Sequence, residues 1–353
     1  MSSWDRRDLG LQSLGTAQIG DVRALAPYRS LRFLVAMFLV ALGALPVLAA
    51  SKTAKEPPPP LQRGEDVLKW INGYRAKPEP QRLPQAVKAM VQFGATKDMD
   101  QAGIYVGFTA GVLGSNPDKA EELVTKMFPL APEDQVLVIR AIAYSGLPDW
   151  KELMGKFVER MPARKVLIDK FMFGNKPLLA DLPVKDDQSA IDVNWGYYFA
   201  TGAEEPLKRI VKILAWSSDK DDVEKLTIGA TAKWTLAQNA ARDGELLAML
   251  KDISESEQDA KVRPPLREVI DAAETLELSK IRKQAVASIE ELKAKGPENV
   301  RSYNWWGQAG LTALSFGCVV ASALGQVEFG IPCVIGGAAS QAAIKYLSPS
   351  GGR

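Results

Sequence analysis

The stretch Ile142–Val158, IAYSGLPDWKELMGKFV, contains the unit that decides the fold. An apolar segment ends at Gly146, a short polar turn with Asp149 follows, and apolar residues then recur every three or four positions. Glycine just after a helix and an acidic residue at the start of the next one are common stop and start signals. The stretch therefore predicts two helices joined by a short turn, which form a helical hairpin.

The same pattern recurs elsewhere in the chain. It is present in AGVLGSNPDKAEELVTKMF (110–128) and YFATGAEEPLKRIVKIL (198–214), and more loosely in LAQNAARDGELLAMLKDI (236–253). The glycines at 114, 146, 202 and 244 are unevenly spaced, which argues against a fixed-period array. Helical periodicity extends over the middle of the chain, without sustained period-two alternation. We therefore predict an all-α fold of irregular, stacked helical hairpins, arranged like a solenoid, over residues 63–300.

This layout resembles tetratricopeptide and related α-solenoid proteins, although the W-x-x-L-G-x-x-Y signature of tetratricopeptides is missing. The chain also resembles uncharacterised exported helical proteins of Gram-negative bacteria. That resemblance depends on the apolar N-terminal segment and on NWGYYFATG (194–202). It covers roughly the middle two-thirds of the chain, and it implies export and a helical fold without any known activity.

An export signal is predicted at residues 33–50, FLVAMFLVALGALPVLAA, an uncharged apolar run that follows Arg29 and Arg32. Small residues near Ala49 suit signal peptidase, so we expect cleavage after Ala49 or retention of the run as an anchor. The polar region 1–32 is long for a signal peptide, which also suggests a coding start later than Met1. Each alternative predicts a periplasmic or secreted protein. The proline-rich segment 51–62 that follows is predicted to be a stiff spacer.

The C-terminal region 301–353 contains two apolar segments rich in glycine and alanine, 309–324 and 329–344. They flank Glu328 and predict a helical hairpin. Cys318 and Cys333 lie about symmetrically around its turn, and thiols outside the cytoplasm are expected to oxidise. A disulfide-linked hairpin packed on the preceding helices is the leading interpretation. A membrane-associated hairpin over residues 304–344 and an unlinked pair of core helices are the alternatives.

Composition excludes several classes of chemistry. The chain of 353 residues has 44 basic and 42 acidic residues, a net charge of +2, and no clustered basic excess, so no nucleic-acid partner is predicted. It contains no histidine, which removes histidine-dependent triads, dyads and zinc motifs. Its two cysteines are too few for a structural zinc site. We therefore assign no catalytic residue, no cofactor and no metal site from the sequence.

The densest aromatic cluster is DVNWGYYFATG (192–202), which reads as a helix with most of its aromatic residues on one face. Aromatic side chains are enriched at interfaces, so one interpretation is a recognition surface with polar contacts at its edge. The alternative is a core helix whose rings fill the space between hairpins. The residues of the predicted recognition surface are Asp192, Asn194, Trp195, Tyr197 and Tyr198.

These features favour an exported, non-catalytic interaction or scaffold protein of the cell envelope, because α-solenoids present extended surfaces to protein partners. The identity of such partners does not follow from the sequence. Two alternatives stay open. One is an exported hydrolase that uses a pair of carboxylates, for example on glycans. The other is a membrane-active protein that works through the C-terminal hairpin, with membrane contact through residues 33–50 or 304–344.

Overall fold

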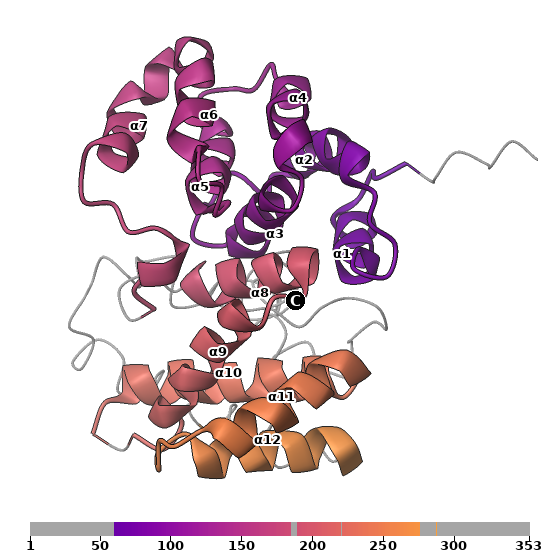
Figure 1. Ribbon diagram of the computed structural model, residues 1–353, viewed down its shortest axis with the longest axis vertical. Coiled ribbons are helices and arrows are strands. Elements are labelled where there is room, and N and C mark those ends of the chain that lie inside the picture. The colour runs from indigo at the N-terminus through magenta and orange to yellow at the C-terminus, as the bar shows by residue number, and fades with distance from the viewer. Residues whose placement is uncertain (1–59, 185–188, 220, 276–286, 288–353) are drawn as a thin grey trace, which may run out of the picture. The chain divides into compact units, whose positions relative to one another are not determined.

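The computed structural model describes residues 60–184, 189–219, 221–275 and 287. All of them belong to the second of the two units into which the chain divides, which begins at Pro59. Every regular element within the described residues is helical, which confirms the all-α prediction (Figure 1). The predicted signal or anchor at 33–50, the proposed Cys318–Cys333 bridge and the C-terminal hairpin lie outside the described residues.

The α-helices that the described residues form are α1 (Gly64–Gly73), α2 (Leu83–Gln92), α3 (Gly103–Gly114), α4 (Pro117–Met127), α5 (Gln135–Tyr144), α6 (Trp150–Phe157), α7 (Lys165–Met172), α8 (Ser189–Thr201), α9 (Glu204–Ile213), α10 (Val223–Ala240), α11 (Gly244–Ser256) and α12 (Arg263–Thr275). Short 3₁₀ turns lie between them at η1 (Pro80–Arg82), η2 (Val158–Arg160), η3 (Pro162–Arg164), η4 (Leu179–Asp181) and η5 (Leu214–Trp216).

The four turns predicted from the recurring pattern are present. They connect α3 to α4, α5 to α6, α8 to α9 and α10 to α11, and the two helices of each pair contact each other. Gly146 and Gly202 follow α5 and α8 with φ of 75° and 68°, in the left-handed region where side chains with a Cβ are strained. These two glycines therefore end their helices as the sequence predicted.

Acidic residues begin two of the later helices. The side chain of Asp222 accepts a hydrogen bond from the backbone of Lys225, and that of Asp243 accepts from Glu245 and Leu246. Each interaction satisfies backbone N–H groups that have no partner within the helix. Asn116, the residue before α4, makes no such cap, and its side-chain amide instead donates 2.8 Å to the Val112 carbonyl of α3.

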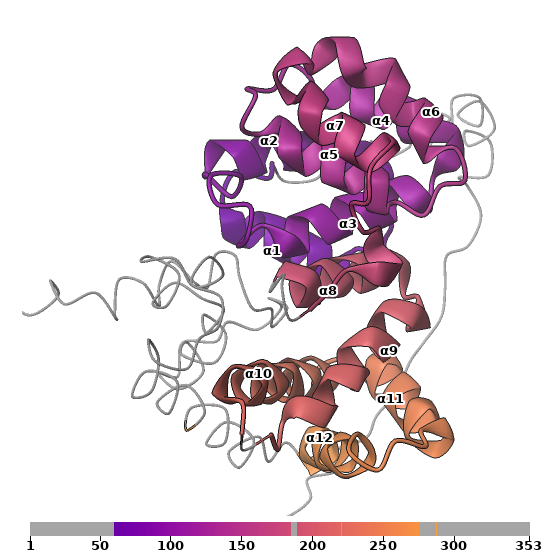
Figure 2. The ribbon, with the colours of Figure 1, turned by 90° about the vertical axis from the view of Figure 1, so that its left-hand side faces the viewer.

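The most extensive helix pairing joins α3 to α8, which are separated in the sequence by α4 to α7 (Figure 2). Helix α3 also packs on α5, and α10 packs on α12 and η5. A solenoid-like stack is not confirmed, because strictly sequential stacking would keep α3 and α8 apart. In the part of the chain that the structure describes, no helix combines the length and apolar character needed to cross a bilayer.

Candidate functional site

The aromatic helix predicted as a recognition surface is α8, and its side chains are mainly internal. Asp192, Asn194, Trp195 and Tyr198 are at most 2% exposed. Tyr197 is half-buried, and its hydroxyl donates 3.1 Å to the carbonyl of Ser145. The prediction of a recognition surface is therefore wrong for Asp192, Asn194, Trp195 and Tyr198. Their burial fits the alternative interpretation, a core helix.

The reason for this burial is an unusually close approach of α8 to α3. A Cβ atom built on Gly107 would lie 1.9 Å from the carbonyl oxygen of Val193, and one on Gly196 would lie 2.2 Å from that of Ile104. A Cβ atom built on Gly103 or on Gly111 would likewise lie 2.6 Å from the nearest atom of α8. Glycines at 103, 107 and 111 thus form a smooth strip on α3 that lets the two backbones meet, which no larger residue would allow.

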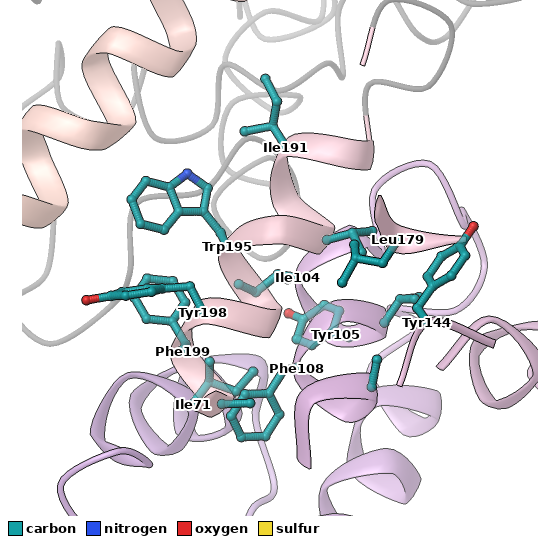
Figure 3. Close-up of a cluster of buried hydrophobic side chains, with 14 of the residues drawn as sticks. Ile71, Ile104, Tyr105, Phe108, Tyr144, Leu179, Ile191, Trp195, Tyr198 and Phe199 are labelled. Carbon is teal, nitrogen blue, oxygen red and sulfur yellow. The ribbon is translucent and has the colours of Figure 1, made fainter. Parts of the chain in front are cut away.

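Aromatic rings fill the space on either side of this crossing (Figure 3). Phe108 of α3 meets Trp70 and Tyr74 edge-on, with ring centroids 5.1 Å apart in both pairs. On α8, Trp195 stacks on Phe199 at 5.5 Å, and its indole N–H donates 3.2 Å to the hydroxyl of Thr235 in α10. The rings of α8 are therefore packing elements that connect it to other helices.

The side-chain amide of Asn194 in α8 also has its hydrogen-bond partners within the protein. Asn194 Nδ2 donates 2.7 Å to the carbonyl of Ala190, and its Oδ1 accepts from Arg209 at 3.4 Å. A buried amide with partners on both sides avoids the penalty of an unpaired polar group. Asn194 therefore supports the α8–α9 packing and is not available to an external ligand.

A charged cluster joins three helices that are distant in the sequence. Arg75, just after α1, donates hydrogen bonds to the hydroxyl of Tyr198 in α8 and to the carboxylate of Asp243 at the start of α11. Its guanidinium also lies 4.6 Å from the centroid of the Tyr198 ring and 3.6 Å from a Glu245 oxygen. Arg75 and Asp243 are 18% and 23% exposed, so solvent screens this ion pair only partly.

Burial changes the acidity of two tyrosines near these contacts. Loss of hydration raises the pKa of Tyr198 to about 12, against the opposing effect of Arg75. The same cause raises the pKa of Tyr74 to about 12. Both phenols are thus neutral at physiological pH and act as packing and hydrogen-bonding groups, with no tendency to serve as bases.

A carboxylate-pair hydrolase would need two acids that face each other. The buried acidic residues of the described chain are Asp134, Asp192 and Glu224, which lie at the start of α5, in α8 and in α10. Asp134 accepts a hydrogen bond of 2.5 Å from the hydroxyl of Thr96. Within the described ranges, no group of three or more potential metal ligands comes together. These positions identify no catalytic arrangement.

The candidate site lies on α7 and the segment that follows it, which sequence reasoning did not single out. Val166 is 71% exposed, Phe173 79% and Leu178 36%, and these are the large exposed hydrophobic residues of the described chain. Exposed lysines lie among them. We call this set the α7 surface; it consists of Lys165, Val166, Lys170, Phe173, Lys176 and Leu178.

The opposite face of α7 anchors the helix. Ile168 and Phe171 are buried, and Phe171 meets Tyr144 of α5 edge-on at 5.9 Å. The Lys151 ammonium of α6 donates 2.8 Å to the carbonyl of Met172 at the end of α7, where the helix dipole favours a cation. Val166 in α7 and Phe173 directly after it are therefore exposed on a helix whose other face is packed.

In comparisons with known proteins, no protein-family model, curated protein or solved structure matches the chain.

Proposed function

We propose that this chain is an exported, non-catalytic protein of the cell envelope whose helical frame presents the α7 surface to another envelope component. The apolar run at 33–50 with its preceding arginines supports export. The observation that carries the interaction role is the α7 surface, because the large exposed hydrophobic side chains of the described residues all lie between positions 166 and 178.

Exposed apolar side chains have a physical cost that makes this clustering informative. Single exposed hydrophobic residues are ordinary, but adjacent ones with a polar border are typical of interaction sites. Phe173 leaves most of its ring in water, while the neighbouring Phe171 is only 5% exposed. Covering Phe173 and Val166 by a partner would recover the hydrophobic free energy that folding leaves unused.

The frame behind this surface is suited to hold it in place. The α5 helix, on which Phe171 packs, contacts α3, and α3 is locked against α8 through the glycine strip. Arg164 at the start of α7 also donates 2.6 Å to the carbonyl of Pro132. A preorganised surface loses little conformational entropy when it binds, which supports a scaffold role.

Photo-crosslinking in the native host tests the proposal. A photoreactive phenylalanine analogue would replace Phe173 in one variant and the exposed Lys119 of α4 in a matched control. We expect adducts with envelope components from position 173, and far fewer from position 119. Equal adducts at both positions, or none at 173, would contradict the interaction role, and recovery of the protein in the cytoplasmic fraction would contradict export.

A further inference from the structure

We propose that the α7 surface docks on an anionic lipid bilayer. This inference rests on the proposed function, because it names the envelope component that the surface meets. It depends on three observations about α7 and the segment after it: where the apolar side chains lie, which charges surround them, and how the helix is held on its other face.

The apolar side chains of this segment divide into exposed and buried ones. Seven residues correspond to about two helical turns, so helical spacing places Val166 and position 173, the residue directly after α7, on one side of the helix, and both residues are mostly exposed. Ile168 and Phe171 lie on the other side and are buried. Amphipathic helices that combine apolar side chains with lysine and arginine lie in the membrane interface with the apolar side chains inserted, so we expect Val166 and Phe173 to insert.

The charges around these side chains favour lipid over protein. From residue 164 to 178 the chain has four basic residues, Arg164, Lys165, Lys170 and Lys176, and one acidic residue, Asp169, a net charge of 4 − 1 = +3. Asp169 forms an ion pair of 3.0 Å with Lys165, so these two charges offset each other and the net charge comes from Arg164, Lys170 and Lys176.

The type of basic residue also matters. Lysine is depleted at protein–protein interfaces, where arginine, tyrosine and tryptophan are enriched. At a bilayer, its long apolar stem lies along the acyl boundary while the ammonium reaches the phosphates. Three lysines around Phe173 and Val166 are therefore the composition expected of a bilayer contact.

The contact is expected to be weak and reversible. One short helix buries few apolar groups, and stable anchoring generally requires a second membrane signal. Each basic residue near an anionic surface contributes modestly, and salt weakens that contribution. We therefore expect binding that depends on anionic lipid and declines as ionic strength rises.

Hydrogen–deuterium exchange of the full chain gives a readout confined to this surface. The protein would be measured alone, with vesicles of phosphatidylcholine, and with vesicles of phosphatidylcholine mixed with phosphatidylglycerol. We expect peptides covering residues 164–178 to be protected by the anionic vesicles only, and the protection to decrease at high salt. A lipid titration of this local protection gives an apparent affinity even where other segments of the chain also bind the vesicles.

Two pairs of variants separate the apolar and electrostatic parts. V166S/F173S is expected to weaken the local affinity by about tenfold or more, since two apolar side chains no longer insert. K165Q/K170Q is expected to weaken it by about tenfold. The matched control K88Q/K119Q removes the same charge from exposed positions on α2 and α4 and should leave the protection of 164–178 unchanged.

The remaining outcomes each overturn the inference. Absence of protection with anionic vesicles, protection that survives V166S/F173S, or equal protection by neutral vesicles would refute an anionic bilayer contact. Protection that grows with protein concentration without lipid would assign the surface to a second copy of the chain. If vesicles fail but position 173 still crosslinks to an envelope protein, the proposed function holds with a protein partner; if both experiments fail, the proposed function fails too.

Discussion

Helices α3 and α7 are both rich in apolar residues, yet they occupy opposite environments. Every residue of α3 from Gly103 to Leu113 is buried, whereas Val166 in α7 and Phe173 directly after it are mostly exposed. The difference lies in what stands between the apolar residues. Helix α3 has glycines at 103, 107 and 111 that let the backbone of α8 approach closely, while α7 has exposed lysines among its apolar residues. Apolar content alone therefore does not say whether a helix is covered.

The largest effect is expected from adding a side chain where α3 and α8 are in close contact. Gly107→Ala places a Cβ 1.9 Å from a backbone oxygen of α8, where neither helix can yield without separating. We expect a loss of more than about 4 kcal/mol in the free energy of unfolding, or failure to fold. Urea denaturation followed by circular dichroism measures it.

The control for this substitution is Gly155→Ala in α6. No atom lies within 4 Å of a Cβ built there. Alanine at this position should stabilise the protein by about 0.5–1 kcal/mol, since it restricts the unfolded chain and favours helix. If both variants behaved alike, the distinction between a packed and an open helix face would be lost.

The next largest effect is expected at high pH, which should lower the stability of the packed region. The pKa values of Tyr74 and Tyr198 are raised from 10.0 to about 12 on folding, so between these values the unfolded chain has lost phenolic protons that the folded chain keeps. Stability is therefore fully present below about pH 10 and declines as pH rises towards 12, by about 2–3 kcal/mol for each tyrosine. The melting temperature, measured across this pH range, should decline less steeply for Tyr198→Phe than for the unaltered protein. An identical slope would contradict the raised pKa of Tyr198.

A smaller effect is expected at the Arg75 cluster, which joins α8 to α11. Asp243→Ala removes both an ion-pair partner of Arg75 and the side chain that caps α11. We expect a loss of about 2 kcal/mol. Asp243→Asn keeps a capping oxygen and should lose about half as much. Equal losses in chemical denaturation would mean that the charge matters and the cap does not, while no loss for Asp243→Asn would mean the reverse.

The smallest effect on stability is expected on α7. Val166→Ser and Phe173→Ser together should change the free energy of unfolding by no more than about 0.5 kcal/mol, because both side chains are largely in water already. Calorimetry of the purified protein measures this. A clear drop in melting temperature would mean that these residues belong to the core, and the contrast between α3 and α7 would disappear.

Local features of the fold were predictable from the sequence. The turns at Gly146 and Gly202 follow from a glycine after an apolar segment and an acidic start to the next helix, which are interactions between near neighbours. The pairing of α3 with α8 was not predictable in this way, because it depends on packing between distant segments. Its signal was nonetheless present in the glycines at 103, 107 and 111, which recur at a spacing of four residues.

The candidate site shows the same limit. The aromatic residues of α8 suggested a surface, but a cluster of rings has the same sequence pattern whether it covers the core or faces a partner. On α7, Val166 and Phe173 read as ordinary apolar positions of an amphipathic stretch. Only the packing of Ile168 and Phe171 determines which of the apolar residues remain outside.

The pairing of α3 with α8 also affects how the chain is made. During synthesis α3 leaves the ribosome well before α8, with all of α4 to α7 in between. Until then the glycine strip and the apolar side chains of α3 lack the helix that covers them, and contacts of high sequence separation form slowly. The nascent chain therefore passes through a stage in which α3, whose residues from Gly103 to Leu113 are all buried in the fold, is open to chaperones, and α3 reaches its final packing only after more than half of the protein has been translated.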